Sequence, residues 1–219
     1  MGFLVKLAGK QLKDIKTFLN IAVENITEGK VIAFPTNSVY GIGGDPLNLN
    51  VVNRLYDIKF RDRAKGFLLL VSDIEEALKI AEFNDVAEKL AKRYWPGQLT
   101  LILKKKEPSI IPPEVSAFKN SIGLRVPENE IILSILKLLK KAGHLGIIIG
   151  TSANYSSEPP CISGEEVAKK LLSPIDLIID GGKSKSQLST TIVDCTKAKP
   201  VFLRIGKIPE EAILEFLSE

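Results

Sequence analysis

Hydroxyl and cationic side chains gather in four clusters, each at the edge of an apolar segment with strand character. Their members are Thr36 with Ser38; Lys59, Arg61, Arg63 and Lys65; Ser121 with Arg125; and Ser152 and Asn154 joined to Thr190, Thr191 and Arg204. In α/β proteins, such side chains at strand ends commonly hold an anionic ligand. Together the clusters favour a ligand that carries both phosphates and a carboxylate.

Two arginines carry more information than the other members of these clusters. Serine, threonine and asparagine also satisfy turns, and lysines also solvate surfaces, so most cluster members have an ordinary alternative role. Arg125 lies within the apolar segment 122–126, and Arg204 lies in the apolar segment 201–205. An arginine in such a strand usually faces a carboxylate or phosphate, which its planar guanidinium binds through paired hydrogen bonds.

Three familiar motifs nearly fit the sequence and then fail. The segment Gly41–Pro46 ends in proline where a dinucleotide fingerprint requires its third glycine. Gly182–Ser184 resembles the end of a phosphate-binding P-loop, but Leu177 stands where the first glycine is required. Gly150–Asn154 lacks the last glycine of a GxSxG elbow, and His144 is the single histidine, which argues against a Ser-His-Asp hydrolase and a zinc site.

Several segments match one family in order and spacing, although each match alone is weak. They are Pro35–Gly43, Lys59–Asp62, Trp95–Gly97 with Leu99 and Thr100, Gly123–Pro127, Thr151–Asn154 with Pro159 and Pro160, Thr190–Asp194, and Leu203–Gly206. Through them the chain resembles the YrdC/TsaC family of threonylcarbamoyl-AMP synthases over residues 21–208. The resemblance implies synthesis of L-threonylcarbamoyl-AMP and pyrophosphate from L-threonine, bicarbonate and ATP.

The resemblance also implies the partners of the reaction. The product would pass to the machinery that transfers the threonylcarbamoyl group to adenosine in tRNA, and contact with tRNA or double-stranded RNA stays open. Mg²⁺ would arrive with ATP, held by phosphate oxygens and water, with no dedicated protein-ligated metal. Such a reaction needs placed reactants and cations that stabilise the departing pyrophosphate, so no resident nucleophile is required.

Site residues follow from the resemblance position by position. ATP binding is assigned to Lys59, Arg61, Lys65, Ser121, Ser152, Asn154 and Arg204, with Lys59 and Arg61 as the catalytic cations. Threonine binding is assigned to Thr36, Ser38, Arg125, Gly150 and Thr190, with Arg125 pairing the amino-acid carboxylate. Any lid over the site is expected from the chain's own loop at 181–188.

The chain departs from the family pattern at three places. Asp62 replaces the proline after Arg61, which favours a more mobile cationic loop. Asn37-Ser38 replaces Glu-Thr, so the hydroxyl is kept and the carboxylate is lost. Leu70 stands where many members carry a histidine that contacts threonine.

Two other functions compete with the synthase. A non-catalytic RNA-binding module would use the lysines of segments 104–106 and 137–141 as a phosphate-binding face, although these also fit solvated element ends. A relative that makes a simple carbamoyl-adenylate is the second alternative. The acyl-phosphate and zinc-finger-like modules that accompany that role are not found in the sequence.

Alternating elements are predicted to position these residues. Strands are expected at 31–34, 67–71, 99–103, 121–126, 145–149 and 176–179, with an antiparallel hairpin formed by 191–195 and 201–204. Helices are expected at 11–28, 49–58, 73–80, 85–94, 129–142, 163–172 and 210–217. This alternation predicts one α/β domain over 1–219, with a twisted mixed sheet flanked by helices.

Composition is consistent with that prediction. The 219 residues are 45% hydrophobic and 26% charged, with a net charge of +4, which is ordinary for a globular protein. No apolar run approaches the ~20 residues that a membrane span needs. Cys161 and Cys195 are far apart and fit reduced, buried thiols. We therefore expect a cytoplasmic protein that does not contact a membrane.

Overall fold

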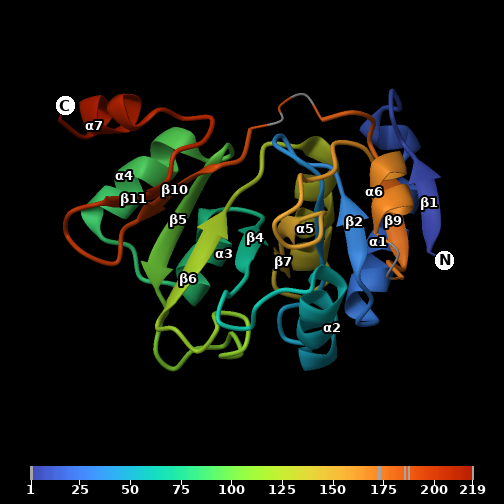
Figure 1. The fold of residues 1–219 in the computed structure, drawn as a ribbon, viewed down its shortest axis with the longest axis horizontal. Helices are drawn as coiled ribbons and strands as arrows, with labels where there is room; N and C mark the ends of the chain where they lie inside the picture. The colour runs from blue at the N-terminus through green and yellow to red at the C-terminus, as the bar shows by residue number, and fades with distance from the viewer. Residues whose placement is uncertain (1, 172–173, 185, 187, 219) are drawn as a thin grey trace.

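The computed structural model describes residues 2–171, 174–184, 186 and 188–218. Its strands form two mixed sheets, and Figure 1 shows them side by side, with the chain ends at opposite sides of the molecule. In spatial order, one sheet contains β1 (Phe3–Lys6), β9 (Leu177–Asp180), β2 (Ile32–Phe34), β3 (Gly41–Gly43) and β8 (Thr151–Ser152). The other contains β11 (Val201–Arg204), β10 (Thr191–Asp194), β5 (Leu99–Lys104), β6 (Ser121–Arg125), β4 (Leu68–Val71) and β7 (Ile147–Ile149).

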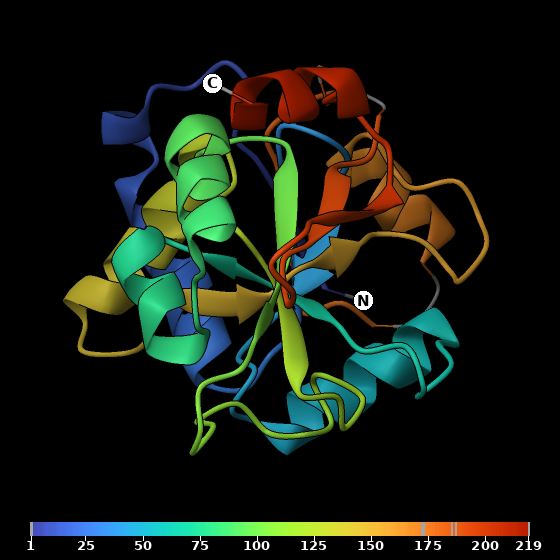
Figure 2. The same ribbon diagram turned by 90° about the vertical axis from the view of Figure 1, so that its left-hand side faces the viewer.

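Helices cover both sheets, as the sequence predicts. They are α1 (Lys16–Thr27), α2 (Leu49–Lys59), α3 (Ile74–Ile80), α4 (Asp85–Tyr94), α5 (Glu130–Lys141), α6 (Gly164–Lys170) and α7 (Glu210–Ser218), with a short 3₁₀ helix at Leu12–Asp14. Figure 2 shows α3 and α4 together on one side of the six-stranded sheet. Three of these helices have side-chain caps, because Asp73, Asn84 and Asn129 each accept a hydrogen bond from the first turn of α3, α4 and α5.

The two faces of the six-stranded sheet serve different purposes. Leu101, Leu103, Leu124 and Val193 belong to the main core, together with Leu90 of α4. The residues that alternate with them along β5 and β6 point to the opposite face, because side chains alternate along a strand. These include Thr100, Ile102, Ser121, Gly123 and Arg125, and they line a cavity. The second core lies between α1, α5 and the strands β2, β9 and β7.

The mixed α/β class is confirmed, but the strands form two sheets where the sequence suggested one. The division rests partly on strands that the sequence pattern did not reveal: β1, β3 and β8. In β3, the glycines weaken the usual strand signal. Gly43 must nevertheless lack a side chain, since a Cβ there would lie 1.6 Å from the Ile149 carbonyl oxygen.

Several predicted boundaries shift by a few residues. The first helical segment, expected at 11–28, is broken at Ile15, which separates the 3₁₀ turn from α1. The strand expected at 145–149 begins at Ile147. The helix expected to reach residue 172 ends at Lys170, and residue 172 lies outside the described residues. The hairpin of β10 and β11 is antiparallel as predicted.

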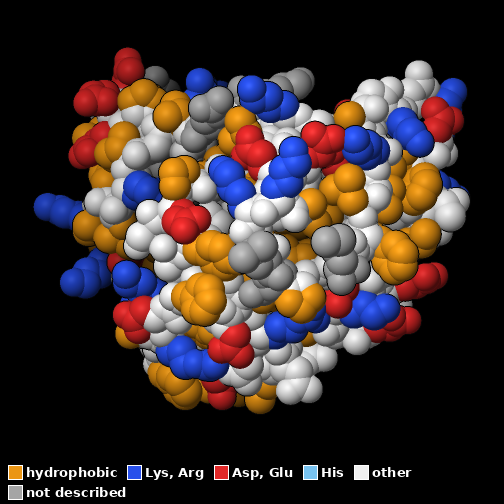
Figure 3. Space-filling view, turned by 45° about the vertical axis from the view of Figure 1, so that its right-hand side comes forward, with side chains coloured by type: hydrophobic (Ala, Val, Ile, Leu, Met, Phe, Trp, Pro, Cys, Tyr) orange, Lys and Arg blue, Asp and Glu red, His pale blue; other side chains and the backbone are white. Residues whose placement is uncertain are grey.

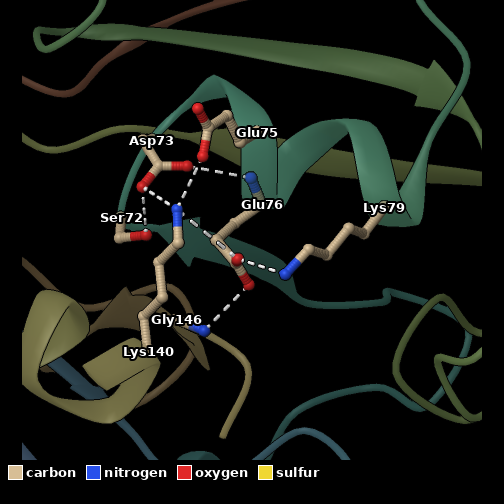
Figure 4. A network of polar contacts seen from close by, with 7 residues as sticks. All are labelled: Ser72, Asp73, Glu75, Glu76, Lys79, Lys140 and Gly146. Carbon is tan, nitrogen blue, oxygen red and sulfur yellow. Dashed lines mark hydrogen bonds and ion pairs between the residues drawn. The ribbon is translucent and has the colours of Figure 1, made fainter. Parts of the chain in front are cut away.

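A charged cluster fixes α3 against α5 and the turn before β7 (Figure 4). Glu76 is fully buried, and its carboxylate accepts hydrogen bonds from Lys79 Nζ at 2.5 Å and Gly146 N at 3.0 Å. Lys140 Nζ lies 2.9 Å from both Asp73 Oδ2 and Glu75 Oε2. The Glu76 carboxylate is therefore paired although it is buried, and the cluster holds α3 and α5 at the β4–β7 end of the six-stranded sheet.

Candidate active site

The cavity has a volume of about 650 Å³ and is lined by residues from both sheets. Its floor is the open face of β5, β6 and β10, including Thr100, Gly123 and Ile192. Its walls come from the loop after β2, from the segment that begins at Gly150, and from Thr190 and Arg204. Members of all four sequence clusters therefore line one cavity.

Arg125 is the most deeply buried cation on the cavity wall, at 5% exposure. Its guanidinium donates from Nε to the Gly97 carbonyl at 2.9 Å, from Nη1 to Ser38 Oγ at 3.2 Å, and from Nη2 to Asn37 Oδ1. Burial, together with the positive charge of Arg204, lowers the pKa of Arg125 to about 9. The side chain is still charged at pH 7, and the described residues place no carboxylate in hydrogen-bonding contact with it.

Thr36 and Ser38 extend this network toward the other sheet. Their hydroxyls lie 3.0 Å apart, and Thr36 Oγ1 also donates to the Val39 carbonyl at 2.7 Å. Both residues are buried and both line the cavity. The loop after β2 therefore holds two hydroxyls in one network with the Arg125 guanidinium.

Thr190 and Arg204 contact each other directly. Arg204 donates from Nε to the Thr190 carbonyl and from Nη2 to Thr190 Oγ1, both at 2.9 Å. Thr190 Oγ1 also lies 3.0 Å from Thr100 Oγ1 on the cavity floor. Behind them, buried Thr191 accepts hydrogen bonds from Gly206 N and Ile208 N and so fixes the turn that follows Arg204.

Lys59 does not line the cavity, unlike most of its predicted partners. It is 2% exposed, and its Nζ donates to the Ser152 carbonyl at 2.5 Å, the Asn154 carbonyl at 2.7 Å and Asn154 Oδ1 at 3.2 Å. Burial, together with the positive charge of Arg61, lowers the pKa of Lys59 to about 7. The three contacts oppose this effect, because only the ammonium form can donate three hydrogen bonds at once.

Of the remaining cations in this cluster, only Arg61 lines the cavity. Its guanidinium donates to the carbonyls of Lys65 at 2.8 Å and Gly66 at 2.7 Å, and it lies over the Phe67 ring. The side chain of Lys65 is exposed outside the lining. Arg63 lies along α2, where Nη1 donates to Asn53 Oδ1 at 2.6 Å. The four cations of this sequence cluster therefore do not converge on one site in the fold.

Ser152, Asn154 and Ser121 line the cavity as the sequence clusters suggested. Ser152 Oγ donates to Asn154 Oδ1 at 2.5 Å, so the turn that Lys59 supports presents a linked hydroxyl and amide. Gly150 also lines the cavity, and a Cβ there would lie 2.4 Å from Leu70 Cγ. Leu70 pairs with Arg125 in the sheet register, so this departure from the family pattern lies beside the arginine.

Sequence reasoning missed two features of the site. At Asn37 the sequence shows only a lost carboxylate, whereas in the fold its amide oxygen accepts a hydrogen bond from Arg125 and its Nδ2 donates to Glu128 Oε2 at 3.3 Å. Lys119 falls in a proline-containing loop of the sequence, yet it lines the cavity. The sequence signal that could have identified Lys119 is its position two residues before Ser121, which belongs to one of the four clusters.

Comparison with known proteins gives the family. A family model named Sua5_yciO_yrdC, described as "Telomere recombination", matches residues 24–206. The chain belongs to the Sua5/YciO/YrdC family. A curated threonylcarbamoyl-AMP synthase of Pyrococcus abyssi is 36% identical over 202 residues, which cover 92% of this chain and 57% of that protein. A putative threonylcarbamoyl-AMP synthase of Methanocaldococcus jannaschii is 35% identical over 94% of each chain.

Solved structures of the Sua5/YciO/YrdC family agree with this membership. Pyrococcus abyssi Sua5 complexed with L-threonine superposes with a TM-score of 0.88 at 33% identity, covering 99% of this chain and 61% of that one. Escherichia coli YciO gives a TM-score of 0.80 at 29% identity, covering 97% and 98%. The chain thus spans little more than half of the P. abyssi relative and nearly all of the shorter ones.

Four further observations concern the surface, metal sites, membrane-spanning helices and the expected lid. Lysine and arginine side chains on the face in Figure 3 are interspersed with acidic and hydrophobic ones. Within the described ranges, no three His, Cys, Asp or Glu side chains gather as a metal site. Over the same residues, no helix combines the length and apolar character needed to cross a membrane. The expected lid at 181–188 includes residues 185 and 187, which lie outside the described residues.

The Lys59 contacts generate a stability prediction. Replacing Lys59 with Met removes the donor from three oxygen acceptors, so we expect the free energy of unfolding to fall by about 2 kcal/mol. Urea denaturation measures this. The control is Lys65→Met, which changes an exposed side chain in the loop that follows α2 and should stay within about 0.5 kcal/mol of the parent. Equal stability of the two variants would contradict a supporting role for Lys59.

Proposed function

We propose that the chain synthesises L-threonylcarbamoyl-AMP and pyrophosphate from L-threonine, bicarbonate and ATP. The observation that carries this proposal is the buried, charged Arg125, which faces a cavity lined with hydroxyls and has no carboxylate in hydrogen-bonding contact among the described residues. A buried charge of this kind favours an anionic partner. The curated names of relatives at 34–36% identity support the same activity.

The threonine subsite in this proposal surrounds Arg125. The amino-acid carboxylate pairs with the Arg125 guanidinium, and the hydroxyls of Thr36, Ser38 and Thr190 orient the remaining polar groups. Gly150 lets the Leu70 side chain pack against this wall, since a Cβ at Gly150 would lie 2.4 Å from Leu70 Cγ. The similarity of this chain to P. abyssi Sua5, whose solved structure is a complex with L-threonine, supports this choice of substrate.

ATP occupies the rest of the cavity in this proposal. Its contacts are Arg61, Ser121, Ser152, Asn154 and Arg204, whereas the predicted contact Lys65 lies outside the cavity lining. Lys59 contributes through the turn at residues 152–154, which it supports with three hydrogen bonds. Mg²⁺ accompanies ATP and is held by phosphate oxygens and water.

The reaction follows from placement and charge. Threonine first combines with bicarbonate to give its N-carboxylate, with loss of water. An oxygen of that carboxylate forms a bond to the α-phosphorus, while the bond from the α-phosphorus to the bridging oxygen breaks. The electron pair of the broken bond leaves with pyrophosphate, and nearby cations stabilise the added charge. The product then serves the downstream tRNA threonylcarbamoyl-transfer machinery.

A reconstituted assay tests the activity. Folded protein is incubated with ATP, Mg²⁺, bicarbonate and labelled L-threonine, and pyrophosphate and labelled adenylate are measured. We expect both products only when threonine and bicarbonate are present together. Folded protein that releases no threonine-dependent pyrophosphate would overturn the synthase, and tight RNA binding in that case would favour the non-catalytic module.

Arg125 gives the residue-level prediction. Loss of charge-assisted hydrogen bonds worth about 1.5–3 kcal/mol corresponds to roughly 10- to 100-fold weaker threonine use in Arg125→Ala. We expect the KM for ATP to change less than about threefold. Arg125→Lys keeps the charge and serves as the control for folding and for charge alone. Equal losses for threonine and ATP would show that Arg125 does not select the amino acid.

A further inference from the structure

We propose that Lys119 is a further substrate-binding cation, which contacts the pyrophosphate portion of ATP together with Arg61. The inference rests on the proposed function for the identity of its ligand. Lys119 lies on the loop before β6 and lines the same cavity as Arg125. Among the residues that the structure describes, its ammonium has no hydrogen-bonding partner, so it is available to a ligand.

The cavity extends along β6 with a cation at each end. Ser121, Gly123 and Arg125 alternate on the strand and all line the cavity. Four residues of strand at about 3.3 Å each separate Ser121 from Arg125 by roughly 13 Å. Gly123 lies midway and lines the cavity without a side chain that would project into it. The strand therefore separates an amino-acid end at Arg125 from a second end near Ser121.

Arg61 belongs to that second end. Its Nη2 donates to the Gly66 carbonyl at 2.7 Å. The backbone of Gly66 packs closely on that of Ser116, where a Cβ on Gly66 would come within 2.8 Å of the Ser116 carbonyl carbon. Phe67 N also donates to the Val115 carbonyl at 2.7 Å. The loop of Arg61 and the loop of Lys119 are therefore joined at one wall of the cavity.

The loop that carries Lys119 is held by its own hydrogen bonds. Ser116 Oγ lies 3.0 Å from the Lys119 carbonyl oxygen, and Phe118 N donates to the Pro113 carbonyl at 2.7 Å. Ala117 and Phe118 adopt φ values of +51° and +58°, which side chains other than glycine rarely adopt. Such strain persists where surrounding contacts enforce it, and it clusters at ligand sites.

A second lysine strengthens the positive character of this end. Lys105 is 7% exposed, and its Nζ donates to Ser116 Oγ at 3.2 Å. It therefore places a buried positive charge directly behind a hydroxyl that lines the cavity. Lys105 cannot itself reach a ligand from that position, whereas Lys119 belongs to the lining.

The proposed chemistry requires a cation at this end. When the bond between the α-phosphorus and the bridging oxygen breaks, its electron pair moves to pyrophosphate, which gains negative charge. Arg61 already uses Nε and Nη2 on the carbonyls of Lys65 and Gly66. Lys119 supplies three uncommitted donors where that charge develops.

Titration with magnesium pyrophosphate alone tests the inference. We expect Lys119→Gln to bind pyrophosphate about tenfold more weakly than the parent, as loss of one charge-assisted hydrogen bond predicts. L-threonine binding should be unchanged, and Lys119→Arg should recover most of the pyrophosphate affinity. The matched control is Lys106→Gln, an exposed lysine outside the cavity lining, which should bind pyrophosphate like the parent.

The two proposals can fail separately. If Lys119→Gln binds pyrophosphate as tightly as the parent, or if Lys106→Gln loses as much affinity, the role of Lys119 is overturned while the synthase activity stands. Because the titration needs no turnover, a parent protein that binds pyrophosphate through Lys119 but makes no adenylate supports the cation site and overturns only the synthase. In an active parent, Lys119→Gln should also raise the inhibition constant of pyrophosphate about tenfold.

Discussion

The buried guanidinium of Arg125 is the interaction on which the site depends. It lies in β6 of one sheet and is held by Ser38 and Asn37, which come from the loop after β2 of the other sheet. The Gly97 carbonyl, just before β5, accepts its Nε. All three acceptors are neutral, so the contacts orient the cation without cancelling its charge. In the proposed function, a substrate carboxylate supplies the negative charge that these direct contacts lack.

The division into two sheets makes this arrangement possible. One face of β5 and β6 is covered by α3 and α4, which leaves the opposite face, with Thr100, Ser121 and Arg125, open to the cavity. The five-stranded sheet closes over that face with the turn at residues 152–154, supported by Lys59. Arginine, hydroxyl and amide groups from distant segments therefore converge without any one segment forming a complete site.

Local patterns predicted most elements, and most site residues assigned from the family resemblance line the cavity, but the direction of every side chain was not predictable. Helix caps at Asp73, Asn84 and Asn129 could be predicted because they depend on a few neighbouring residues. The family resemblance assigns Lys59 to phosphate binding. Lys59 nevertheless shares a helical face with Val52 and Leu55, and this spacing directs its side chain inward. The glycine strand β3 and the position of Lys119 depend on contacts with distant backbone, which no local pattern contains.

Calorimetric titration of the parent protein with L-threonine and L-threoninol tests the central role of Arg125 most directly. The two ligands share the side chain and the amino group, but L-threoninol lacks the carboxylate. If Arg125 is held for that carboxylate, L-threonine should bind at least about tenfold more tightly, as loss of a charge-assisted contact predicts. Equal affinity for the two ligands, or no binding of L-threonine to folded protein, would contradict this role.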